Sequence, residues 1–110
     1  MSKYLFIESR DPYESKDCNE SFDLINSLSE KGHDVALYLT QNGVFCARNE
    51  SSVTGFNALL AAKSVTIYAD DYSIEERGIL SNETHSEIKV TSIDKMSDLL
   101  MEDDRKPIWH

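Results

Sequence analysis

The two cysteines are the residues of this chain that could act most readily as nucleophiles. Cys46 lies in the stretch QNGVFCARN, directly after an apolar run. A thiolate at this place could attack a sulfur atom or carry one, and the nearby Arg48 could stabilise its negative charge. The alternative is that Cys46 is a small apolar residue packed beneath the loop, as free cysteine often is. The spacing alone leaves both interpretations open.

Cys18 is the second candidate nucleophile, because it would open a helix if Asp17 is the N-cap. The free backbone N–H groups of a helix start favour an anion by roughly 0.3–1 kcal/mol. This gain is smaller than the roughly 1.4 kcal/mol that corresponds to one pKa unit. The neighbouring carboxylates of Asp17 and Glu20 act in the opposite direction, so an unactivated thiol is the alternative here too.

Other polar residues give weaker signals. Asp70 and Asp71 could bind a hard cation, but side chains alternate in direction along an extended chain, which favours a solvated loop. His33, His85 and His110 are scattered and form no predicted nucleophile–base pair. Neither CxxC nor CxxxH occurs, so a cysteine-rich zinc site is not expected, and no metal or organic cofactor is implied.

Short apolar runs alternate with helical patterns along the chain, and these elements must position the candidates. The predicted strands are Tyr4–Ile7, Val35–Leu39, Val65–Ala69, Glu87–Thr91 and Pro107–Trp109. The predicted helices lie between Asp17 and Gly32, around 56–63, at 73–77 and at 93–100, with 44–52 undecided between helix and loop.

This alternation predicts an α/β fold, in which a mainly parallel five-stranded sheet carries helices on both faces. The chain of 110 residues fits one domain, residues 1–110. In such folds, ligands and chemistry lie beyond the carboxyl ends of the strands. That edge is expected to collect residues 8–16, 41–49 and 70–73. Pro107 indicates that the last strand either starts at this residue or lies at an edge of the sheet.

Composition and missing motifs exclude several classes of function. The net charge of -9 argues against nucleic-acid binding, which needs clustered Lys and Arg. Apolar runs are too short for a signal peptide or a membrane span, so a cytoplasmic protein with reduced thiols is expected. Neither GxGxxG nor GxxxxGK[ST] occurs, which removes the usual nucleotide cradles.

Four stretches in order resemble the DsrE/DsrF/DsrH family, which includes the TusB, TusC and TusD sulfur-relay subunits. These stretches are DPY at 11–13, HDVALYLTQNGVFCARN, VTIYADDYSIEERGI and KPIWH. The resemblance implies a small α/β domain that assembles into trimers or hexamers of identical or related subunits. It also implies transfer of sulfur, as cysteine persulfide, between donor and acceptor proteins.

The chain departs from the family pattern at one important place. In DsrE- and TusD-like subunits the sulfur-carrying cysteine follows the third strand, where this chain has Ala69-Asp70-Asp71-Tyr72. DsrH-like subunits can carry a cysteine within the first helix, and Cys18 falls about one or two turns earlier. The resemblance therefore makes Cys46 or Cys18 the candidate persulfide carrier, with Arg48 stabilising the thiolate.

Two other functions stay open. The chain could be a non-catalytic subunit whose apolar residues, such as Phe45, Val53 and Phe56, bury against a neighbouring chain. It could also be a small-ligand binding module, for which the generic cleft at the strand ends is the sole argument.

Overall fold

The computed structural model describes residues 1–48, 53–62 and 64–110. Its strands are β1 (Lys3–Glu8), β2 (Asp34–Leu39), β3 (Thr66–Asp70), β4 (Lys89–Thr91) and β5 (Arg105–Trp109). Its α-helices are α1 (Asp17–Glu30), α2 (Thr54–Ala62), α3 (Asp71–Glu76) and α4 (Ile93–Leu100). Two 3₁₀ helices, η1 (Gln41–Ala47) and η2 (Ser81–Glu83), follow β2 and α3. Residues 49–52 and 63, which belong to the predicted segments 44–52 and 56–63, lie outside the described residues.

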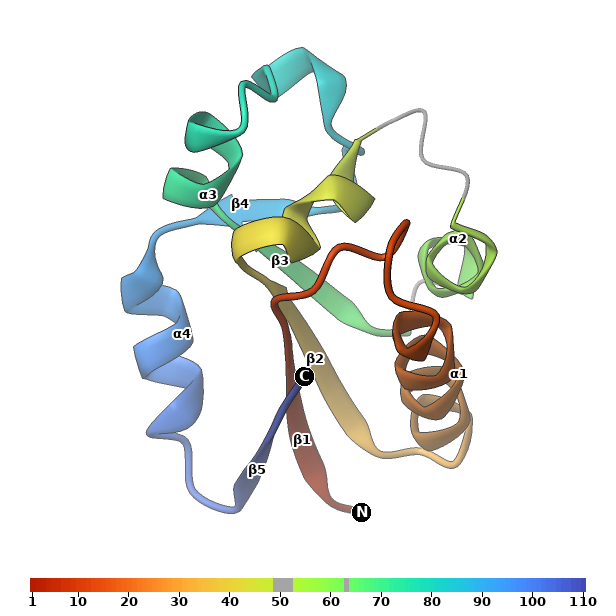
Figure 1. Ribbon diagram of the computed structural model, residues 1–110. Coiled ribbons are helices and arrows are strands. Elements are labelled where there is room, and N and C mark those ends of the chain that lie inside the picture. The colour runs from red at the N-terminus through yellow and green to blue at the C-terminus, as the bar shows by residue number, and fades with distance from the viewer. Residues whose placement is uncertain (49–52, 63) are drawn as a thin grey trace.

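The strands form one sheet in the order β4-β3-β2-β1-β5, and all its pairings are parallel. Figure 1 shows α1 and α2 on one face of the sheet and α4 on the other. The predicted parallel sheet with helices on both faces is confirmed. Of the two alternatives for Pro107, the edge position is confirmed, because β5 is the last strand in this order, whereas the strand starts earlier, at Arg105.

Apolar side chains alternate between the two faces of the central strands, which explains the two cores. Phe6 and Leu37 point toward α1 and α2, where Phe22 and Phe56 pack with ring centroids 5.5 Å apart. Leu5, Ile7 and Tyr38 belong to a second core that Leu99 of α4 covers. Strands buried on both faces read as continuous apolar runs, as they do here.

Some local expectations are wrong. Asp17 is the first residue of α1 and not its cap, since Lys16 holds the cap position without a side-chain hydrogen bond. Phe56 and Val53 do not form a surface for a neighbouring chain, because they are 0% and 6% exposed within this chain's own core. Phe45 is partly buried against the same core. Within the described ranges, no helix combines the length and the apolar character that a bilayer span requires.

Candidate functional site

The carboxyl ends of the strands gather the candidate residues at one edge of the sheet. Cys18 lies in the first turn of α1, after the loop that leaves β1, and its side chain has no exposed surface. The Cys18 Sγ atom lies 3.8 Å from the Arg10 carbonyl oxygen, so this loop covers the thiol. A turn in which Asp11 accepts the backbone N–H groups of Glu14 and Ser15 shapes the covering loop.

A carboxylate and an imidazole lie beside this thiol. Ligand atoms of Glu8, Cys18 and His110 all lie within 4.8 Å of one another. The Glu8 carboxylate is 2% exposed and lies 2.7 Å from Nδ1 of His110, whose side chain is 21% exposed. The backbone N–H of Arg10 also donates to Glu8, at 3.1 Å. These two contacts compensate the buried carboxylate for the water it has lost.

The thiol of Cys18 is held in its protonated form. Burial, a hydrogen bond to Glu8 and the negative charge of Glu8 raise the pKa of Cys18 from 9.0 to about 12. Ser15 and Arg10 act in the opposite direction and are outweighed. Cys18 is therefore an unactivated thiol with a proton acceptor beside it, in contrast to the exposed, electropositive setting of a typical reactive cysteine.

Cys46 lies in the same core cluster as Cys18 and has no exposed surface either. Burial raises its pKa most, and the negative charges of a Cys18 thiolate, Glu8 and Asp11 raise it further. The Arg48 side chain is exposed, and its backbone forms a bridge with Thr84. The stabilising role for Arg48 stays a prediction.

A close backbone approach fixes the segment that carries Cys46. A Cβ atom at Gly43 would overlap the carbonyl oxygen of Glu8, so glycine is required where η1 crosses the end of β1. The backbone N–H of Thr40 donates to the same carbonyl at 3.0 Å. The predicted turn at Asn42-Gly43 thus serves to dock η1 onto β1.

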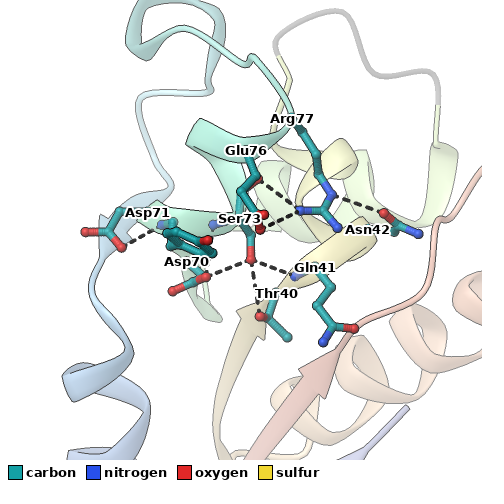
Figure 2. A network of polar contacts seen from close by, with 9 residues as sticks. Thr40, Gln41, Asn42, Asp70, Asp71, Ser73, Glu76 and Arg77 are labelled. Atoms are coloured by element: carbon teal, nitrogen blue, oxygen red, sulfur yellow. Dashed lines mark hydrogen bonds and ion pairs between the residues drawn. The ribbon is translucent and has the colours of Figure 1, made fainter.

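A second group of polar contacts ties η1 to α3, as Figure 2 shows. The Ser73 hydroxyl donates to Asp70 at 2.7 Å and accepts the backbone N–H of Gln41 at 2.9 Å. Its Oγ atom also lies 3.5 Å from the hydroxyl of Thr40. The bond to Ser73 thus gives the backbone N–H of Gln41 an acceptor, at a residue whose backbone is left-handed with φ 50.

Asp70 is the N-cap of α3, which corrects the expectation of a solvated loop at Asp70-Asp71. The Asp70 carboxylate is 6% exposed and accepts the backbone N–H of Ser73 at 3.0 Å. The Tyr38 hydroxyl donates toward it from 3.3 Å. Burial and the Asp70 charge raise the pKa of Tyr38 to about 12. Asp71 is exposed, so the predicted divergence of the two side chains is confirmed.

Arg77 completes the connection between the two loops. Its Nε donates to Asn42 at 3.0 Å, and one terminal nitrogen donates to the Ser73 carbonyl at 3.3 Å (Figure 2). The same nitrogen lies 3.8 Å from the Glu76 carboxylate. Asp70 and Arg77 thus fix the segment that follows β3 and connect it to η1.

Glu8 and His110 were missed as partners of a cysteine by sequence reasoning. Both end strands that a parallel sheet brings to the same edge, which is the signal that could have found them. His110 follows β5, and its backbone N–H donates to Ile7 at 2.9 Å, extending the ladder beyond Trp109. Of the three histidines, His110 joins this cluster, whereas His33 contacts Ser2 and Tyr4 at the other end of the sheet.

Comparisons with known proteins agree with this architecture. A crystal structure of the ychN protein from E. coli has a TM-score of 0.83 and 18% sequence identity, covering 98% of this chain and 100% of that chain. MTH1491, a protein of unknown function from Methanobacterium thermoautotrophicum, has a TM-score of 0.76 and 14% identity, with both chains covered completely. A comparison with curated proteins finds no match. The model of the DsrE/DsrF-like family matches residues 2–106, and the chain therefore belongs to that family.

Proposed function

We propose that the protein is a sulfur-relay protein in which Cys18 accepts a sulfur atom as a persulfide and passes it to an acceptor thiol. Membership of the DsrE/DsrF-like family supports sulfur transfer as the general chemistry. The observation that selects Cys18 is the cluster in which its thiol, the Glu8 carboxylate and the His110 imidazole lie within 4.8 Å.

The reaction needs a proton acceptor, because the resting thiol is protonated. Glu8 takes the thiol proton, and His110, bonded to Glu8 at 2.7 Å and partly exposed, connects the carboxylate with solvent. The Cys18 thiolate then attacks the outer sulfur of a donor persulfide. A new S–S bond forms at Cys18, the donor's S–S bond breaks, and the donor thiolate leaves with the bonding electrons and takes up the proton.

Access to the thiol requires movement of the loop between β1 and α1. Cys18 has no exposed surface, and the Arg10 carbonyl lies against its sulfur. Between Asp11 and Ser15 the loop closes on its own turn, whereas η1, which carries Cys46, is fastened to Glu8 and to α3. This difference favours Cys18 over Cys46, which stays the second candidate carrier with Arg48 as its predicted stabiliser.

The relay would operate in the cytoplasm within a trimer or hexamer, whose subunits are copies of this chain or related chains. Exposed apolar side chains support such assembly, including Trp109 at 62% and Tyr72 at 66% exposure. The same observation supports a second candidate function, a non-catalytic subunit whose partners carry the sulfur. The cap formed by Asp70 where related chains have cysteine favours that alternative.

Intact mass after incubation with glutathione persulfide separates the two functions. Wild type and Cys46→Ser should each gain one sulfur atom, and Cys18→Ser should gain none, with circular dichroism confirming that each variant is folded. A gain that survives in Cys18→Ser and disappears in Cys46→Ser would move the carrier to Cys46. Wild type without any gain would overturn the carrier proposal in favour of the non-catalytic subunit.

A further inference from the structure

Glu8, Cys18 and His110 offer the three kinds of donor atom that zinc-class cations prefer. They supply a carboxylate oxygen, a thiol sulfur and an imidazole nitrogen within 4.8 Å of one another. Such cations bind at about 2.0–2.3 Å from each donor in tetrahedral geometry, which places neighbouring donors roughly 3.3–3.8 Å apart. Small side-chain rotations would therefore bring the three donors around one ion.

The backbones behind these donors are fixed by regular structure. Glu8 closes β1 opposite Leu39 of β2, and Cys18 lies in the first turn of α1. His110 is held in the ladder from both sides, since its N–H donates to Ile7 and its carbonyl accepts from Ser9, each at 2.9 Å. A site built on such positions loses little freedom when it binds an ion.

The surroundings also suit an ion with one coordination position left for solvent. The Arg10 N–H donates to the second carboxylate oxygen of Glu8 and orients the first toward His110. Hydrogen bonds of this kind to ligating carboxylates are typical of metal sites. Because the His110 side chain is 21% exposed, solvent and a metal can reach the cluster from that side.

We propose that Glu8, Cys18 and His110 form a binding site for a single divalent cation of the zinc class. The ion displaces the thiol proton, takes the place of the hydrogen bond between Glu8 and His110, and accepts a water as its fourth ligand. Binding does not depend on sulfur transfer, but an occupied site withholds the Cys18 sulfur from a persulfide donor.

Cobalt(II) is the probe, because thiolate coordination gives a near-ultraviolet charge-transfer band and tetrahedral geometry gives visible bands. Metal-free wild type should show both on titration, with zinc displacing the cobalt. Cys18→Ser should abolish the charge-transfer band, and Glu8→Gln and His110→Gln should each weaken binding by about 10–100-fold or more. Cys46→Ser and His33→Gln are matched controls that should bind as wild type does, since His33 lies at the opposite end of β2.

Wild type that gives no charge-transfer band with excess cobalt would overturn the proposal, and this result does not depend on any variant folding. A band that survives in Cys18→Ser and disappears in Cys46→Ser would also overturn it. Sulfur uptake is measured separately on wild type with a chelator present. Metal binding without sulfur uptake would support the metal site and overturn the relay proposal. Sulfur uptake without metal binding would support the relay and overturn the metal site.

Discussion

Alkylation of Cys18 by iodoacetamide should be slow at neutral pH and should continue to accelerate far into the alkaline range. The Cys46→Ser variant isolates this thiol, and a chelator keeps metal away from it. With a pKa of about 12 in place of 9.0, the thiolate fraction at about pH 8 falls by about a thousandfold relative to an ordinary cysteine. An unstructured peptide spanning residues 9–25 provides the reference rate.

The rate should rise about tenfold for each pH unit beyond pH 9, where a free thiol levels off. This slope holds whether the reagent enters the folded protein or waits for the loop to open. In both cases the resting state is the protonated thiol, so the reactive thiolate grows in proportion to hydroxide until the folded-state pKa is reached. Stopped-flow or quenched mass spectrometry gives the rate at each pH.

Glu8→Gln tests the cause of the raised pKa. Glutamine keeps the size of the side chain and removes its charge, and Glu8 raises the pKa of Cys18 through both its hydrogen bond and its charge. The variant should therefore react faster than its parent at the same pH. A rate for the parent that levels off near pH 9, or a Glu8→Gln rate equal to the parent's, would refute the reasoning.

Three further outcomes follow from the packing around the site. Gly43→Ala should lower the free energy of unfolding by about 1–3 kcal/mol, because its Cβ meets a backbone carbonyl that cannot retreat; an unchanged urea midpoint would contradict this close approach. Asp70→Ala removes the cap of α3 and should destabilise by about 0.5–2 kcal/mol, with the loss of α3 order visible as faster amide exchange at Ser73. Tyr38 binds its proton more tightly when folded, since its pKa rises from 10.0 to about 12, so the stability it contributes is present below about pH 10 and lost as pH rises toward 12. Tyr38→Phe should show a shallower alkaline decline in chemical denaturation than wild type, and an identical decline would count against the shift.

The fold could be predicted from the sequence because its apolar runs are clear. Tyr4–Ile7 and Val35–Leu39 are buried on both faces, and this forces a continuous apolar pattern that periodicity detects. Helix caps were harder to predict. Asp17 and Asp70 both stand at the start of a helical pattern, but Asp17 is the first residue of α1, whereas Asp70 is the N-cap of α3 and accepts a backbone N–H. Local sequence does not distinguish these two aspartates.

The candidate site could be predicted only in part. The two cysteines are visible in the sequence, but their burial depends on which loop covers the sheet edge. The pairing of His110 with Glu8 spans 102 positions along the chain and follows from the strand order, which places β5 beside β1. Strand order is a property of the whole sheet, so no local motif could indicate the contact between Glu8 and His110.

Glu8 makes two kinds of contact that differ in their tolerance of substitution. Its backbone carbonyl accepts the N–H of Thr40 and lies against Gly43, and any residue at position 8 could provide that carbonyl. Its side chain alone faces Cys18 and His110. Evolution or protein engineering could thus replace Glu8 by another residue of similar size and change the groups that face Cys18 and His110. The packing of η1 against the Glu8 backbone would stay the same.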